Sequence, residues 1–343
     1  MSRNRPTIYD IAKLANTSTA TVSRVLNDTG YPVKEELKKR VIKAAKELNY
    51  TPNLVGRHLK TSKSNDIGVI VPSISNPYYS LLVNGVENVA RKRGYNILLC
   101  NSHRDPQREK DYLESLYQKQ VEGIIISSIT SDTEYIKKLQ INGLKIAAFD
   151  QDIDLDCNKV NFDYYRGGCI AAQYLIDRGH RDIGFISAPL TRYSRKELFR
   201  GFADTLKINN IAIKKDLIKI SEFEEETEDQ TYEYKNGKQL VQQIIKKGNI
   251  PSAIFCINDM TAFGVIQGLQ KNHIQIPQDV SVMGFDNITI SEIINPSLTT
   301  IDQCTHEMGS LAAEVLINNI EDENKKYIST MLQPTLVVRN STK

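Results

Sequence analysis

Residues 7–27 read TIYDIAKLANTSTATVSRVLN, and this stretch decides the fold of the amino-terminal part of the chain. Thr7 stands three residues before Asp10, so the hydroxyl and the carboxylate can satisfy free backbone donors where a helix begins. Apolar residues then repeat at helical spacing, at Ile8, Ile11 and Leu14. Ser18 can cap a second helix, whose inward stripe is Val22, Val25 and Leu26. The pattern predicts two short helices joined by a tight turn.

A third helix is expected after Pro32, where an apolar stripe recurs at Leu37, Val41, Ala44, Ala45 and Leu48. Two short helices backed by a third form a helix-turn-helix domain, whose second helix is slim enough to enter the major groove of DNA. The alternative is a small helical bundle that is basic but does not bind DNA, because clustered charged residues often only form the solvent-exposed face of a helix.

The charge of the chain is unevenly distributed. The 343 residues include 44 basic and 41 acidic side chains, a formal net charge of +3. Residues 1–62 carry +7 of this charge and the remainder carries −4. A basic head is typical of a module that meets nucleic acid, and the length predicts two or three domains. Because no apolar run is long enough to span a bilayer and no secretory signal is present, we expect a cytoplasmic protein without a membrane partner.

The amino-terminal pattern resembles the DNA-binding domain of the lactose/galactose repressor (LacI/GalR) family, and the likeness continues through residues 48–60. The resemblance implies that Thr19, Ala20 and Arg24 read bases, since Arg can bind guanine and Ala can meet a thymine methyl group. It implies that other polar residues contact phosphates, which fix position without reading sequence; these are Thr7, Thr21, Ser23 and Asn27. Asn16 and Thr17 stand where the family more often has Gly and Val.

The resemblance also implies a hinge at residues 53–64, between a helix-turn-helix domain at 1–52 and a regulatory domain at 65–340. Leu59 matches the residue that the family inserts into the minor groove to kink the duplex, with Lys60 beside it. A segment as short as 53–60 is not helical alone in water. We therefore expect it to become ordered when two copies pack together on DNA.

Beyond residue 65, compact apolar runs alternate with helical stretches, as in Ile67–Val71, Gly123–Ile126, Lys145–Phe149 and Ala253–Ile257. This alternation predicts an α/β domain with parallel sheets covered on both faces, divided into two lobes. Ligands of such sheets bind beyond the carboxyl ends of the strands. The polar residues that close the runs are therefore the candidates for a binding site, namely Ser127, Asp150, Asn258, Asp259 and Asp286.

The regulatory domain is similar to the two-lobed sugar-binding fold that periplasmic binding proteins share with these repressors. The resemblance implies three crossings between Rossmann-like lobes, which we place near residues 163, 293 and 328. The first lobe then comprises about 65–163 and 296–327, and the second about 164–293 and 328–340. The five cysteines are far apart and mostly lie in apolar runs, which indicates free thiols rather than disulfides or a zinc site.

The same resemblance supplies further residues for an effector site. Tyr79, with Tyr78 as its neighbour, matches the aromatic residue that stacks on the effector ring, and Gln303 matches the polar residue of a crossing segment. Phe223 is a weaker candidate for the opposite wall, and the acidic run 222–229 is expected to be a solvated loop. Leu198 occupies the place of an Arg that clamps the effector in most sugar-responsive relatives. Arg195 or Arg192 is the candidate substitute.

The sequence thus predicts a homodimeric repressor of a carbohydrate utilisation operon that binds palindromic operator DNA. A small sugar or sugar phosphate between the lobes would control it, with no cofactor and no metal. The alternative is a catabolite regulator switched by a serine-phosphorylated carrier protein. An enzyme on the same scaffold finds no support, because the Gly-rich nucleotide motifs and the Gly-x-Ser-x-Gly nucleophile motif are absent.

Overall fold

The computed structural model describes residues 6–26, 31–51, 64–128, 133–150, 155–224, 232–322 and 324–343. The chain divides into two compact units, Met1–Ser64 and Asn65–Lys343, and each is described by itself. No helix within the described ranges is both long and apolar enough to cross a membrane.

The amino-terminal unit contains helices α1 (Ile8–Leu14), α2 (Thr19–Leu26) and α3 (Glu35–Glu47). Its core consists of the apolar stripes that the sequence predicted, with Ile11, Ala12, Ala15, Val22, Val25, Val41 and Ala44 buried. The backbone N–H and the hydroxyl of Thr7 both donate to the Asp10 carboxylate, at 2.8 and 2.7 Å, so the predicted helix start is confirmed. The Ser18 hydroxyl accepts from the Thr21 backbone N–H at 3.2 Å and caps α2.

The turn between α1 and α2 passes through Asn16 in a left-handed conformation, with φ of 48°. Asn tolerates this conformation better than most residues other than Gly. The following N–H, of Thr17, donates to the Ala12 carbonyl at 2.9 Å and closes the turn. The departure of Asn16 from the more common Gly is therefore compatible with a helix-turn-helix.

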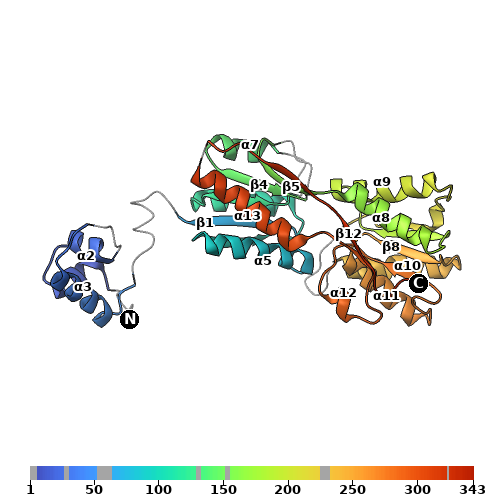
Figure 1. The fold of residues 1–343 in the computed structure, drawn as a ribbon, viewed down its shortest axis with the longest axis horizontal. Helices are drawn as coiled ribbons and strands as arrows, with labels where there is room; N and C mark the ends of the chain where they lie inside the picture. The colour runs from blue at the N-terminus through green and yellow to red at the C-terminus, as the bar shows by residue number, and fades with distance from the viewer. Residues whose placement is uncertain are drawn as a thin grey trace. The chain divides into compact units, whose positions relative to one another are not determined.

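The first lobe of the larger unit is built on a parallel sheet with the strand order β11-β5-β4-β3-β1-β2. Its strands are β1 (Asp66–Val71), β2 (Asn96–Asn101), β3 (Gly123–Ile126), β4 (Lys145–Phe149), β5 (Asn158–Phe162) and β11 (Ser329–Leu332). Helices α5 (Pro77–Lys92) and α13 (Thr305–Glu321) cover one face, as Figure 1 shows, while α6 (Pro106–Gln118) and α7 (Glu134–Ile141) pack against the other. Successive residues of β1 and β3 alternate between the two apolar clusters, as a doubly covered sheet requires.

The second lobe repeats the plan with a smaller parallel sheet in the order β7-β6-β8-β9. The strands are β6 (Ile183–Ser187), β7 (Ile218–Ile220), β8 (Ala253–Cys256) and β9 (Ser281–Met283). Its flanking helices are α8 (Tyr164–Asp177), α9 (Tyr193–Ile208), α10 (Tyr232–Lys247) and α11 (Asp259–Lys271), with a 3-10 turn at Lys215–Leu217 and a short α12 (Ile290–Ile293). The predicted α/β class is confirmed.

The lobes are joined at three places. The chain passes from β5 to α8 at Asp163, where the sequence placed the first crossing. The other two passages lie side by side as an antiparallel pair, β10 (Thr300–Asp302) and β12 (Thr335–Val337). The second and third crossings therefore lie later than the predicted 293 and 328, and β11 belongs to the first lobe. The half-exposed edge strand β11 has no continuous apolar run that would have marked it in the sequence.

Candidate functional site

The outer side of α2 is the candidate surface for DNA. Ala20 and Arg24 are exposed, and Thr19, Thr21 and Ser23 are half-buried around them. The Arg24 guanidinium lies 4.2 Å from the centroid of the Tyr31 ring, a cation–π arrangement that keeps it at the surface. Three further residues that the sequence assigned to DNA, Asn27, Leu59 and Lys60, lie outside the described residues.

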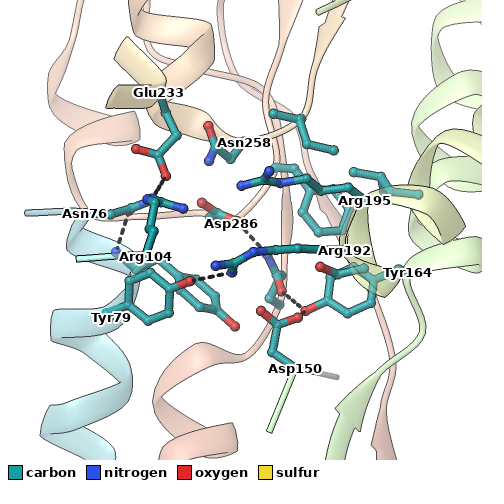
Figure 2. A pocket seen from close by; sticks show the side chains of 16 residues that line it. Asn76, Tyr79, Arg104, Asp150, Tyr164, Arg192, Arg195, Glu233, Asn258 and Asp286 are labelled. Carbon is teal, nitrogen blue, oxygen red and sulfur yellow. Dashed lines mark hydrogen bonds and ion pairs between the residues drawn. The ribbon is translucent and has the colours of Figure 1, made fainter. Parts of the chain in front are cut away.

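A pocket lies between the two lobes of the larger unit, and polar side chains from both lobes line it (Figure 2). The first lobe contributes Asn76, Tyr78, Tyr79, Arg104 and Asp150. The second lobe and the crossings contribute Tyr164, Arg192, Ser194, Arg195, Leu198, Glu233, Ile257, Asn258, Phe285, Asp286 and Gln303. The pocket is at the carboxyl ends of the strands, where open parallel sheets bind ligands.

One hydrogen-bonded chain crosses the floor of the pocket from lobe to lobe. Tyr164 Oη donates to the Asp150 carboxylate and lies 3.1 Å from Gln303 Oε1, and Gln303 Nε2 donates to Asp286 Oδ1 at 2.5 Å. Tyr164 has a single proton but two acceptor neighbours. All three hydrogen bonds can form at once in two ways. In the first, Asp150 is protonated and donates to Tyr164, whose own proton goes to Gln303. In the second, the Gln303 amide is turned over, so that its nitrogen donates to Tyr164 and its oxygen accepts from a protonated Asp286. The geometry therefore calls for one proton shared by this pair of carboxyl groups.

The electrostatic surroundings of the two acids agree with that proton count. Burial raises the pKa of Asp150 to about 6, although the Tyr164 hydroxyl, Arg192 and Arg195 act in the opposite direction. Burial also raises the pKa of Asp286 well above its usual range, and the neighbouring Asp259 and Glu233 raise it further. Desolvation disfavours the charged form of a carboxyl group, so both residues hold protons more readily than in water.

A second cluster, in the wall of the pocket and directly behind it, joins the lobes through ion pairs. Arg104, from the turn after β2, pairs with both Glu224 and Glu233 of the second lobe, and its side chain is only 5% exposed. Arg195 forms a two-pronged pair with Glu224, with nitrogen–oxygen distances of 2.8 and 2.6 Å. Asn76 Nδ2 donates to Glu233 Oε1 at 3.0 Å. Such paired charges are strongly held once water is excluded.

Arg192 is the third cation of the pocket, and Figure 2 shows its guanidinium between Tyr79 and Asp150. Its Nη1 lies 3.5 Å from the Tyr79 hydroxyl, and no ion pair to a carboxylate is recorded for it among the described residues. The Tyr79 ring stands edge-on to that of Tyr78, with centroids 5.0 Å apart. These groups, with the apolar Leu198 and Phe285, form a cavity that combines ring faces with hydrogen-bonding groups.

The two units match separate family models. Residues 7–53 match the model of bacterial regulatory proteins of the lacI family, and residues 64–339 match that of periplasmic binding proteins and the sugar-binding domain of the LacI family. The chain belongs to the LacI family. It is therefore a DNA-binding transcriptional regulator that carries a sugar-binding type of domain.

Curated LacI-family relatives align over almost the whole chain. The transcriptional repressor PurR of Histophilus somni is 33% identical over 98% of this chain and 99% of its own length. The ribose operon repressor of Haemophilus influenzae is also 33% identical, over 98% of each chain. A family member from Enterococcus faecium solved with bound ribose is 28% identical, covers 81% of this chain and 98% of its own, and superposes with a TM-score of 0.71. A lac repressor dimer bound to operator shares the fold, with a TM-score of 0.85 over 99% of both chains at 24% identity.

The pocket of this LacI-family chain is lined by most of the residues that the sequence analysis proposed for effector binding. These residues are Tyr78, Tyr79, Asp150, Arg195, Asn258, Asp286 and Gln303. Asn258 also caps α11, because its side-chain oxygen accepts from the Thr261 N–H at 2.9 Å. Leu198 is a buried apolar residue of the pocket wall. Arg195 reaches the pocket from α9, the helix that also carries Leu198, and Arg192 reaches it from the residue just before α9.

Three suggested residues do not line the pocket. Phe223 is 73% exposed, and its neighbour Glu224 points inward instead, so the acidic run is not wholly a solvated loop. Ser127 is buried beside β1, where its N–H donates to the Ile70 carbonyl at 3.4 Å. Asp259 is fully buried behind the pocket, and its carboxylate accepts from Ser291, Thr300 and the Ile288 N–H at 2.6, 2.6 and 3.0 Å. Asp259 therefore braces the second lobe against a crossing strand.

Sequence reasoning missed several polar residues of the site, above all Asn76, Arg104, Tyr164 and Glu233. Asn76 precedes the aromatic pair, and its place before Pro77 is a signal of a helix cap, since its oxygen accepts from the Tyr78 N–H at 3.0 Å. Arg104 and Glu233 carry no local signal. Within the described ranges, no group of His, Cys, Asp and Glu side chains is arranged to hold a metal ion.

Proposed function

We propose that this LacI-family chain is a homodimeric repressor of a carbohydrate utilisation operon, controlled by a small sugar or sugar phosphate bound between its lobes. The observation that carries the proposal is the interlobe pocket, where Asp150, Asp286 and Asn258 converge with the Tyr79 ring. Carboxylate and amide oxygens accept hydrogen bonds from hydroxyl groups, and a ring face stacks on a sugar ring. A ligand that contacts both lobes also stabilises one relative position of the lobes.

The proposed DNA contacts follow from the exposed side of α2. Thr19, Ala20 and Arg24 would read bases in the major groove, while Thr7, Thr21 and Ser23 would contact phosphates. Asn27, Leu59 and Lys60 are assigned from the sequence alone, with Leu59 as the wedge in the minor groove. The charge of +7 on residues 1–62 supports this division of roles.

The homodimer is proposed because one short recognition helix reads only a few base pairs. Two copies related by a twofold axis would read a palindrome with half-sites about one helical turn apart. The effector would act by rotating the first lobes of the dimer against each other, which changes the spacing of the two hinge segments and hence whether they order on DNA.

Operator binding tests this function. A palindromic site selected from random DNA by the full-length chain is titrated by fluorescence anisotropy, with and without each member of a panel of sugars and sugar phosphates. We expect cooperative binding to the palindrome, much weaker binding to a single half-site, and a shift in affinity with at least one panel member. Binding that responds only to a serine-phosphorylated carrier protein would instead assign the chain to the catabolite regulators.

A further inference from the structure

The charges of the interlobe pocket form a balanced set. Three arginines, Arg104, Arg192 and Arg195, line it. Four acids line it or pair with its arginines, namely Asp150, Asp286, Glu233 and Glu224. The hydrogen-bonded chain through Tyr164 and Gln303 requires one of these acids to be protonated. With that proton in place, the described groups carry three positive and three negative charges.

Two of the three arginines are already engaged by glutamates. The side chains of Arg104 and Arg195 are 5% and 9% exposed, and Glu224 lies between them and pairs with both. An anion that took Arg104 would leave the buried Glu233 without its counter-charge, and one that took Arg195 would leave Glu224 with Arg104 alone, which Glu233 already shares. Uncompensated buried charge is strongly unfavourable, so the ion pairs oppose an anionic ligand rather than attract one.

Two further groups of the pocket remain for a ligand. One is the Arg192 guanidinium, whose charge is balanced by the ionised member of the Asp150–Asp286 pair, and the other is a carboxylate oxygen of Glu233. Glu233 is 2% exposed, and its Oε2 has no hydrogen-bond partner within the described residues. Its other oxygen already accepts from Arg104 and Asn76. A buried carboxylate oxygen in the wall of a pocket is satisfied by a ligand hydroxyl or amino group and repels a phosphate.

We propose that Glu224 and Glu233 make the pocket selective for uncharged, hydroxyl-rich effectors, by neutralising Arg104 and Arg195 and thereby excluding phosphorylated ones. This inference rests on the effector role proposed above and narrows it. Glu224 is the residue that determines the selection without contacting the ligand, since it stands behind Arg195 and is absent from the pocket lining.

The test uses the full-length chain and three probes: D-ribose, D-ribose 5-phosphate and inorganic phosphate, titrated by calorimetry at constant ionic strength. We expect the wild type to bind both ribose 5-phosphate and inorganic phosphate at least roughly tenfold more weakly than ribose. Glu224→Gln removes the counter-charge of Arg195, so its affinity for both phosphates should rise roughly tenfold to a hundredfold. Glu222→Gln changes an exposed neighbour in the same way and should match the wild type.

Each outcome decides the proposal. Wild-type binding of phosphate or ribose 5-phosphate as tight as that of ribose overturns it, as does a folded Glu224→Gln chain with no gain for either phosphate. If Glu224→Gln does not fold, Glu233→Gln, which removes one of the two glutamates that pair with Arg104, takes its place. If ribose itself does not bind but the variant gains phosphate binding, the charge selection stands and only the choice of sugar is wrong. Loss of operator binding or of any ligand response is the separate failure of the proposed function.

Discussion

Gln303, just beyond crossing strand β10, donates a 2.5 Å hydrogen bond to the carboxylate of Asp286, at the end of the second-lobe sheet. Through Tyr164 the same amide is tied to Asp150 at the end of the first-lobe sheet. The bond therefore belongs to a series of hydrogen-bonded side chains that spans the cleft between the lobes. Two of these side chains, Tyr164 and Gln303, stand directly after a crossing between the lobes. A ligand that replaces any link changes how the lobes are held together.

The first prediction concerns pH. Burial raises the pKa of Asp150 to about 6, above the ordinary value of about 4. An acid with a raised pKa in the folded state contributes stability that is complete below the unfolded-state pKa and is lost as pH rises through the folded-state pKa. The wild type should therefore lose about 2 kcal/mol of unfolding free energy, relative to Asp150→Asn, between pH 4 and pH 7.

Urea unfolding across this pH range measures the difference. Ser194→Ala, which changes the same pocket without removing an ionisable group, is the control and should show no pH-dependent difference from the wild type. A constant difference between the wild type and Asp150→Asn at every pH would contradict the raised pKa of Asp150.

The second prediction concerns Asp259. Replacement by Ala leaves the donors of Ser291, Thr300 and Ile288 buried and unpaired, and should lower the free energy of unfolding by about 3 kcal/mol. Ser291→Ala removes one donor and should lower it by only about 1 kcal/mol. Denaturant melts measure both effects. If Asp259→Ala is as stable as the wild type and has lost effector binding, the bracing role is wrong and the sequence-based effector role is right.

The third prediction concerns base reading. Arg24→Ala should relax the preference at one base pair in each half-site by about 1 to 3 kcal/mol. Thr21→Val should weaken binding to all sequences equally, because a phosphate contact carries no sequence information. Competition binding against a set of single-base variants of the selected palindrome separates the two patterns. Uniform weakening by Arg24→Ala would remove it from the base-reading residues.

The fourth prediction concerns the hinge. Leu59→Ala should strongly weaken binding to the selected palindrome, while weak binding to unrelated DNA, which depends on phosphate charge, stays nearly intact. The two affinities are measured on fragments of equal length at the same salt concentration. Equal losses on both fragments would refute the wedge assignment of Leu59.

The helical head and the central strands could be predicted from the sequence because their signals are local. The cap at Thr7, the stripe through Val22 and Val25, and the apolar runs of β3 and β4 each depend on residues within a few positions of one another. Edge strands such as β7 and β11 were missed, because short, half-exposed strands lack that continuous apolar run.

The site was only partly predictable for a physical reason. Residues at strand ends, such as Asp150 and Asp286, are marked by the run that precedes them. Arg104 and Glu233 are separated by more than a hundred residues and meet only because the lobes face each other, so no spacing announces their ion pair. Asp259 shows the opposite failure, since it stands at a strand end but turns away from the pocket into the second lobe.

The central claim is that a ligand in the interlobe pocket controls DNA binding by the head. The most direct measurement is operator anisotropy with the wild type and Asp286→Ala, each with and without a sugar that shifts the wild-type curve. The account predicts that operator binding by Asp286→Ala no longer responds to that sugar. An unchanged response in Asp286→Ala would contradict it.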